Sequence, residues 1–157
     1  MKIETEPCSP TKIIEATIDR FRLTLERSQV EILTKLPATP EILISPDALS
    51  QIMTNLISNV EKYALEGKQL VVTMAHENER LSVTVSDQGP GITKSQREQI
   101  FEPFKRLSQD TTEGVSGVGL GLAISRELAI KMGGSLKLQA SAKGATFKLT
   151  IPAPLAS

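Results

Sequence analysis

Residues 45–63 read SPDALSQIMTNLISNVEKY and carry both the start signal and the periodicity of an amphipathic helix. Ser45 is suited to be the N-cap, and Pro46 takes the first helical position, where its missing N–H group costs nothing. Apolar residues then recur at helical spacing, and Gly67 is placed to end the helix. They are Leu49, Ile52, Met53, Leu56, Ile57, Val60 and Ala64. One side of this helix is therefore expected to face a hydrophobic core.

The segments on either side alternate between helix and strand patterns. Ser9-Pro10 repeats the same start signal and predicts a helix that ends near Arg27. A further helix is expected over residues 118–132, where Gly133-Gly134 would stop it. Strands are expected over residues 30–36, 42–44, 69–76, 80–87, 135–140 and 145–151.

Short turns at Glu77-Asn78 and Lys143-Gly144 would join neighbouring strands as hairpins, which are antiparallel. The pattern therefore predicts an α+β fold, a two-layer α/β sandwich in which a mixed, mostly antiparallel sheet packs on about three helices.

The composition suits one domain over residues 1–157. Apolar residues make up 39% of the chain and aromatic residues only 3%, so the core must consist mainly of Leu, Ile, Val and Ala. The 18 basic and 18 acidic side chains balance, which argues against a nucleic-acid surface held by general positive charge. Cys8 is the single cysteine, so no internal disulfide is possible. With no long apolar run and no leader pattern, we expect no membrane contact and a cytoplasmic location, although the parent protein could be anchored in a membrane.

A polar stripe runs along the edge of the helix that starts at Ser45. Asn55, Asn59 and Lys62 fall within about 60° of one another at helical spacing, and Tyr63 follows them. An Asn oxygen suits a hard cation such as Mg²⁺, and Lys suits phosphate. The alternative is that these are ordinary residues at the solvent edge of an amphipathic helix.

The segment Asp87-Gln88-Gly89-Pro90-Gly91-Ile92 stands where a strand ends. A carboxylate there could accept a hydrogen bond from a ligand amine, while the glycines let the backbone approach the ligand. Considered alone, the segment is better explained as a plain turn, because Asp, Gly and Pro are common turn residues.

Glycines 114, 117, 119 and 121 lead into the apolar helix that begins Leu122-Ala123-Ile124. Such a segment can cradle phosphate with free N–H groups, and a flexible linker is the alternative. It is not a dinucleotide fingerprint, since Leu122 stands where the last glycine would be. The long connection before it contains Phe101, Phe104, Lys105 and Arg106 and suits a functional lid or a disordered segment.

In this order, the motifs resemble the ATP-binding catalytic domain of sensor histidine kinases, within the GHKL (Bergerat-fold) superfamily that also includes DNA gyrase, mismatch-repair MutL and heat-shock chaperone ATPases. Residues 55–63 resemble the asparagine box of that family, and residues 45–51 resemble its lead-in. Residues 87–92 and 117–122 resemble the two glycine boxes. Residues 100–104 resemble the phenylalanine box, and residues 144–147 resemble the closing motif.

The resemblance implies a site for ATP and Mg²⁺. Asp87 would bind the adenine amino group with help from Thr146, Asn59 would be the Mg²⁺ ligand, and Lys62 would contact phosphate. Asn55 and Lys62 would be the catalytic residues, and residues 93–116 would form the ATP lid. The implied cofactor-binding residues are Asn55, Asn59, Lys62, Tyr63, Asp87, Gly89, Gly91, Ile92, Phe104, Lys105, Arg106, Gly117, Val118, Gly119, Leu120, Gly121, Leu122 and Thr146.

Asn55 favours a kinase over an ATPase. The hydrolysing members place a Glu there as the general base, whereas an amide cannot take up a proton near neutral pH. His76 is the only histidine and is expected to be an incidental surface residue. The acceptor histidine would lie on a separate dimerisation domain, with relay to a response regulator receiver domain, and the isolated chain would be a monomer. The alternatives are an ATP-sensing module without phosphotransfer and a serine kinase of the anti-sigma type.

Overall fold

The computed structural model describes residues 3–63, 69–87, 120–140 and 145–156. In this part of the chain the helices are α1 (Pro10–Arg27), α2 (Pro46–Tyr63) and α4 (Leu120–Lys131). The strands are β1 (Glu6–Cys8), β2 (Glu31–Lys35), β3 (Ile42–Ile44), β4 (Gln69–Glu77), β5 (Arg80–Asp87), β6 (Ser135–Ala140) and β7 (Ala145–Pro152).

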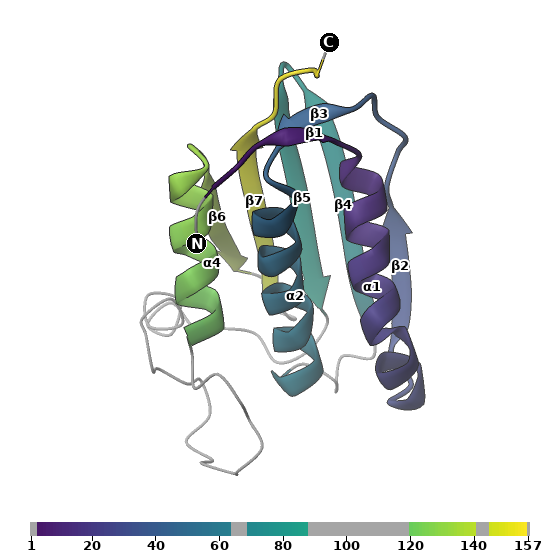
Figure 1. The fold of residues 1–157 in the computed structure, drawn as a ribbon. Helices are drawn as coiled ribbons and strands as arrows, with labels where there is room; N and C mark the ends of the chain where they lie inside the picture. Colours follow the sequence, from purple (N-terminus) through teal and green to yellow (C-terminus); the bar gives the residue numbers. More distant parts are fainter. Residues whose placement is uncertain (1–2, 64–68, 88–119, 141–144, 157) are drawn as a thin grey trace.

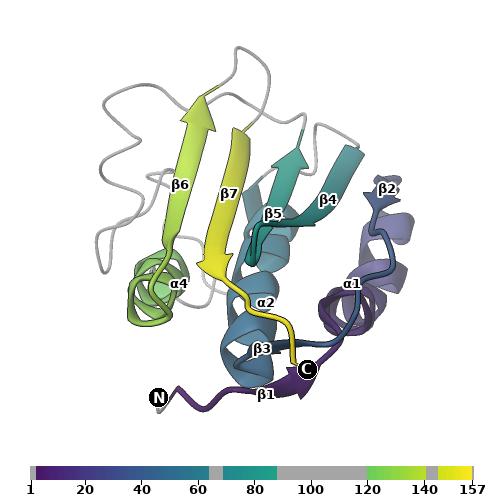
Figure 2. The same cartoon turned by 90° about the horizontal axis from the view of Figure 1, so that it is seen from above.

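The elements form two layers, as the sequence predicts. The described residues include a five-stranded sheet with the order β2-β4-β5-β7-β6, and α1, α2 and α4 cover one of its faces (Figures 1 and 2). Neighbouring strands are antiparallel except for the parallel pair β2 and β4. A parallel pair needs a crossover connection, and α2 lies within the one that joins these two strands. The predicted mixed, mostly antiparallel sheet is therefore confirmed.

Both predicted helix starts are confirmed at the level of single hydrogen bonds. The Ser9 hydroxyl accepts from the backbone N–H of Lys12 at 3.3 Å, and the Ser45 hydroxyl accepts from that of Ala48 at 3.2 Å. Each serine thereby satisfies one of the N–H groups that the first helical turn leaves without a partner.

The predicted stop of α4 is also confirmed. Gly133 has a φ of +87°, and the N–H of Gly134 donates to the carbonyl of Ala129 at 2.9 Å. This pattern is a Schellman motif, in which a left-handed glycine ends the helix. The chain then turns directly into β6.

The hairpin between β4 and β5 turns one residue later than predicted. Glu77 pairs with Arg80, so the two turn residues are Asn78 and Glu79, with φ values of +52° and +58°. Two consecutive positive φ values define the turn that suits the twist of a two-residue hairpin. Asn tolerates that conformation well, whereas Glu occupies it only because the strand register requires it.

The sequence did not predict β1 or the strand-like course of the C-terminal tail. Both pair with β3: Glu6 lies opposite Ile44 in an antiparallel pair, and on the other side Leu43 donates to the Pro154 carbonyl at 2.9 Å. This small ribbon crosses the beginnings of α1 and α2 (Figure 1). Three-residue strands that form by pairing with distant segments carry too little periodicity to be recognised in a sequence.

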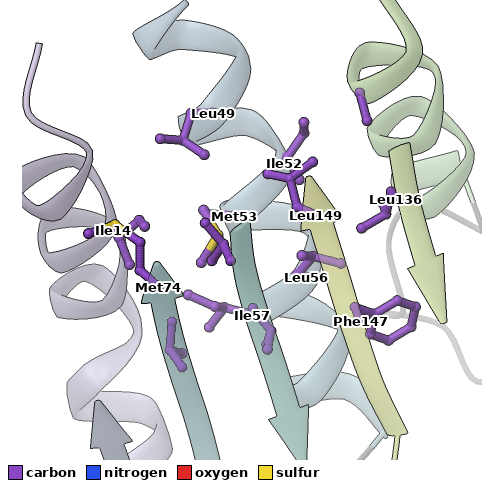
Figure 3. Close-up of a cluster of buried hydrophobic side chains, with 14 of the residues drawn as sticks. Ile14, Leu49, Ile52, Met53, Leu56, Ile57, Met74, Leu136, Phe147 and Leu149 are labelled. Atoms are coloured by element: carbon purple, nitrogen blue, oxygen red, sulfur yellow. The ribbon is translucent and has the colours of Figure 1, made fainter. Parts of the chain in front are cut away.

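Helix α2 occupies the middle of the core (Figure 3). Its side chains Leu49, Ile52, Met53, Leu56 and Ile57 are all 0% exposed. Figure 3 shows them facing apolar side chains from the other elements. These partners include Ile14 of α1, Met74 of β4, Leu136 of β6, and Phe147 and Leu149 of β7. Burial of each Leu or Ile contributes about 1.5–3 kcal/mol, so α2 is firmly fixed, and its polar stripe is held with it.

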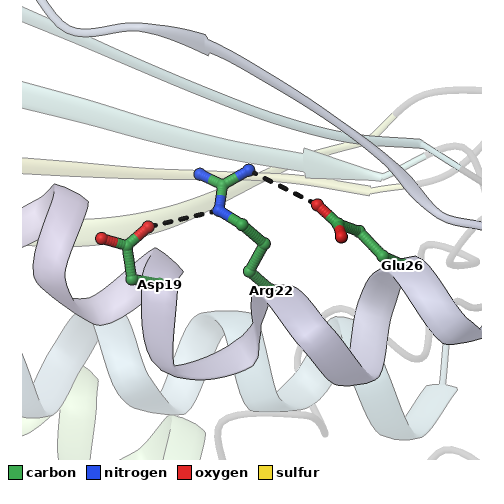
Figure 4. A network of polar contacts seen from close by, with 3 residues as sticks. All are labelled: Asp19, Arg22 and Glu26. Carbon is green, nitrogen blue, oxygen red and sulfur yellow. Dashed lines mark hydrogen bonds and ion pairs between the residues drawn. The ribbon is translucent and has the colours of Figure 1, made fainter.

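The outer face of α1 carries a small charged network instead (Figure 4). Arg22 lies 3.2 Å from Asp19 and 3.8 Å from Glu26, and the three side chains are 45–67% exposed. Ion pairs this exposed contribute little to stability, so α1 depends on its apolar face. In the described part of the chain, no helix is both long enough and apolar enough to span a bilayer.

Candidate functional site

Three elements bring the described candidate residues to one end of the sandwich. Asp87 ends β5, Asn55 and Asn59 lie in the second half of α2, and Gly121 lies in the first turn of α4. Figure 1 shows the end of β5, the end of α2 and the start of α4 at the same end of the molecule. Segments that are far apart in the sequence therefore lie at the same end of the molecule.

Asp87 lies on the face of the sheet that the helices cover. Burial alternates along β5, and Asp87 shares the buried side with Val83 and Val85. Its side chain is only 6% exposed, and Oδ1 accepts a hydrogen bond from the backbone N–H of Ala145 at 3.3 Å. A buried carboxylate is costly unless hydrogen bonds compensate it, so the first residue of β7 helps to hold this group at the strand end.

Asn55 is tied to α4 by both protons of its amide. Its Nδ2 donates to the carbonyl of Gly121 at 2.9 Å and to the hydroxyl of Ser125 at 2.8 Å. Its Oδ1 accepts from Nε2 of Gln51 at 3.1 Å. Three of the four hydrogen-bonding positions of the amide are thus occupied by protein groups, which leaves one acceptor position on Oδ1 for a ligand or water.

Asn59 lies one helical turn beyond Asn55 and is half-buried. A neutral amide oxygen on a rigid helix suits Mg²⁺, which usually takes only one or two protein ligands beside water and phosphate oxygens. The described residues contain no cluster of three or more His, Cys, Asp or Glu side chains that could hold a metal by itself. The Asn59 amide oxygen is chemically suited to be one such protein ligand.

Thr146 does not lie beside Asp87, in contrast to what the resemblance implies. In the β5–β7 pair, Ser86 is opposite Thr146, and the two hydroxyl groups are hydrogen-bonded at 2.9 Å. Successive residues of a strand point to opposite faces, so Thr146 faces away from the helices and Ala145 takes the place next to Asp87.

Residues 44–155 match the sequence profile of the histidine kinase-, DNA gyrase B-, and HSP90-like ATPases. The chain belongs to this ATPase family. It is 34% identical over 145 residues to the sensor histidine kinase WalK of Bacillus subtilis, and 30% identical over 141 residues to the sensor-like histidine kinase SenX3 of Mycolicibacterium smegmatis. These matches cover 90% and 89% of the chain but only 24% and 37% of the two relatives.

Solved structures agree with this assignment. ShkA in complex with AMPPNP superposes with a TM-score of 0.85 at 26% identity, over 100% of this chain and 33% of that one. The mycobacterial sensor histidine kinase MprB gives a TM-score of 0.76 at 25% identity, over 96% of this chain and 99% of that one. The expected membership of the histidine kinase group is thereby confirmed.

Several predicted residues of this ATPase-family domain lie outside the described residues. They are Gly89, Gly91, Ile92, Phe104, Lys105, Arg106, Gly117, Val118 and Gly119, together with the expected lid at residues 93–116. The backbones of Lys62 and Tyr63 belong to α2 and that of Leu120 to α4, but their side chains are not described. Leu122 is only 7% exposed and packs in the core.

His76 of the ATPase-family domain is not the incidental surface residue that the sequence suggested. It is half-buried, and its Nε2 is hydrogen-bonded to the carbonyl of Ala153 at 2.8 Å. The imidazole thereby joins β4 to the segment after β7. Sequence reasoning also assigned no role to Ser125, for which the only signal was a polar residue inside an apolar helix.

Proposed function

We propose that this chain is the ATP-binding catalytic domain of a sensor histidine kinase, with a single domain over residues 1–157. It would bind MgATP and donate the γ-phosphate to a histidine on a separate dimerisation domain, for relay to a response regulator in the cytoplasm. The observation that carries the proposal is the buried Asp87 at the end of β5, a strand end that lies at the same end of the molecule as the end of α2 and the start of α4. This arrangement would offer the Asp87 carboxylate as a hydrogen-bond acceptor for the base, and the two helices as the binding elements for the triphosphate.

Asp87 would select the base. A carboxylate accepts a hydrogen bond from the amino group of adenine, and it would repel the carbonyl oxygen that guanine carries at the same ring position. Because Asp87 is buried, a nucleotide that leaves it without a donor loses a charge-assisted hydrogen bond, which is worth about 1.5–3 kcal/mol. Selectivity for adenine therefore follows from the chemistry of this one side chain.

The two helices would hold the triphosphate. The first turn of α4 has N–H groups without intrahelical partners, which favour an anion. Asn59 would be a ligand of Mg²⁺, and Lys62 would contact phosphate. Bound Mg²⁺ would neutralise charge that builds up on the phosphate oxygens during transfer.

Two features support transfer to an outside nucleophile rather than hydrolysis. Asn55 is an amide, which cannot remove a proton from water, and both of its amide protons are bonded to α4. His76 is remote from the site, because Leu70 of β4 pairs with Asp87 while His76 lies six residues further along the strand, about 20 Å away. The acceptor histidine would therefore come from another domain.

Binding of the nucleotide can be tested by calorimetry with MgATP. We expect Asp87→Asn to weaken binding about 10- to 150-fold, because the amide has no charge and, with its oxygen on the Ala145 N–H, turns its NH₂ donor toward the adenine amino group. Ser86→Ala is the matched control, since Ser86 is the neighbouring residue on the opposite face. Equal affinities for wild type and Asp87→Asn would refute the role of Asp87.

Transfer can be tested with γ-labelled ATP and the helical dimerisation domain of the parent kinase. We expect acid-labile label on the histidine of that domain, passage of the label to a receiver domain, and slow release of inorganic phosphate without acceptor. If nucleotide binds tightly and the histidine stays unlabelled, the chain is a nucleotide-binding module and not a kinase. Label on a serine of a partner protein would favour the serine kinase alternative.

A further inference from the structure

A polar cluster lies in the otherwise apolar contact between α2 and α4. It consists of Gln51 and Asn55 on α2, and of the Gly121 carbonyl and the Ser125 hydroxyl on α4. Ser125 is 0% exposed. A buried hydroxyl group is costly unless it is bonded, so its position between two helices needs a reason.

Two other buried residues, Thr17 and Ser45, use their hydroxyl groups within their own helix. Thr17 donates to the Ile13 carbonyl at 2.9 Å, and Ser45 caps α2. Ser125 instead reaches across to another helix, where it accepts from Asn55 at 2.8 Å. The hydroxyl group of Ser125 therefore joins two elements rather than completing one.

The chemistry of the partners fixes the orientation of the Asn55 amide. A backbone carbonyl can only accept, so the Asn55 atom 2.9 Å from the Gly121 oxygen must be the NH₂ group. The Ser125 hydroxyl takes the second proton, and Oδ1 must then point toward Gln51, which donates to it at 3.1 Å. Each contact thus supports the others, as neighbouring bonds in a polar network do.

We propose that Ser125 is a positioning residue for the phosphate end of the nucleotide, acting through Asn55. This inference rests on the proposed function. Asn55 lies one turn before Asn59, and Gly121 lies in the first turn of α4, so the cluster joins the helix of the metal ligand to the helix end that faces phosphate. The cluster fixes the position of the first turn of α4 along α2. This matters because the residues of a binding site must be held to within about 0.5 Å of their working positions.

Ser125→Ala tests the inference because it removes the acceptor and keeps the helix. One Asn55 proton then lacks its partner at this half-buried contact, and the amide is held by Gly121 and Gln51 alone. We expect the affinity for MgATP to fall about tenfold, which corresponds to about 1.4 kcal/mol. The affinity for AMP, which has the base but lacks the outer phosphates, should change by less than about twofold.

Thr54→Ala is the matched control. Thr54 is the neighbour of Asn55 on α2, and its hydroxyl group also makes one bond to another helix, accepting from Arg20 of α1 at 2.8 Å. This variant also loses one bond between helices, an exposed one that joins α2 to α1 instead of α4. We expect its affinities for MgATP and AMP to equal those of wild type, and thermal unfolding should be measured for both variants.

Gln51→Ala provides a second test of the inference if Ser125→Ala does not fold. Gln51 is half-buried, and its loss frees Oδ1 of Asn55 without opening the core. We expect MgATP affinity to fall about threefold, and the double variant to lose less than the product of the two single effects, because both act through Asn55.

The possible outcomes separate the two proposals. If Ser125→Ala is less stable but binds MgATP as Thr54→Ala does, Ser125 is only structural and the inference fails, while the proposed function stands. Equal losses for MgATP and AMP would also overturn the inference, since the effect would not be confined to the phosphate end. If wild type binds no MgATP at all, the proposed function fails and the inference fails with it.

Discussion

Gly134→Ala should destabilise this fold far more than the same change at the neighbouring Gly133. A Cβ atom on Gly134 would lie 1.9 Å from the carbonyl oxygen of Thr150 and 2.8 Å from the Cα atom of Ile151. Both atoms belong to the backbone of β7, so no side-chain rotation relieves the contact. Because glycine has no Cβ, the end of α4 can lie directly against this strand.

The size of the effect follows from these contacts. Close carbon–oxygen contacts in proteins are about 3.3 Å or longer, so the two segments must separate by about 1.4 Å. That shift breaks the bond from Gly134 to Ala129 and weakens the pairing of Ser135 with Thr150. Two bonds at about 1 kcal/mol each, with about 1–3 kcal/mol for overpacking, give a loss of about 3–5 kcal/mol.

Gly133→Ala is the control because its cost has another origin. Gly133 has a φ of +87°, which costs an alanine about 1–2 kcal/mol, but its Cβ would lie 3.3 Å from the side chain of Pro152. Equilibrium unfolding in urea, followed by circular dichroism, gives both values. A loss for Gly134→Ala within about 1 kcal/mol of that for Gly133→Ala would show that the contact with β7 yields easily, and would refute the reasoning.

Three further substitutions or reactions test other contacts. Gly121→Ala should leave the unfolding free energy unchanged or raise it by up to about 1 kcal/mol, because the added Cβ would lie at an ordinary contact distance of 3.5 Å from the Asn55 side chain. A loss above about 1 kcal/mol in urea unfolding would contradict this expectation. Thr146→Val should leave MgATP affinity within about twofold of wild type, because Thr146 faces away from Asp87; a larger loss in calorimetry would place Thr146 in the site. Burial raises the pKa of the Cys8 thiol, so iodoacetamide should alkylate Cys8 at pH 8 more slowly than it alkylates an exposed cysteine. The alkylation rate of Cys8 should continue to rise above pH 9. Equal rates for Cys8 and an exposed cysteine would contradict the effect of burial.

The sequence predicted the main layers because each of their elements carries its own local signal. The serine and proline pairs at the starts of α1 and α2 define both helices without help from the rest of the chain. Alternating burial along β5 and β7 is likewise visible as alternating apolar residues. Elements that form by pairing with distant segments, such as β1, lack such signals, and the sequence missed them.

The sequence motifs predicted which residues form the candidate site, but they did not predict the hydrogen bonds that hold those residues in place. The resemblance identified Asp87 and Asn55 and left open what holds them in place. It also implied that Thr146 acts beside Asp87, although the alternation along β7 puts Thr146 and Phe147 on opposite faces and Phe147 is 1% exposed in the core. The pattern of one strand therefore already indicated on which face of the sheet Thr146 lies.

The two ends of the proposed site are held by different physical means. Asp87 is fixed by the register of β5 with β7, a backbone ladder that a side-chain substitution changes little. The phosphate end depends on how α2 and α4 are placed relative to each other. The apolar contact between these helices is non-directional, whereas the hydrogen bonds from Asn55 require particular partner atoms. Variation in the cluster should thus alter how the nucleotide's phosphates are held, while recognition of the base is preserved by the sheet.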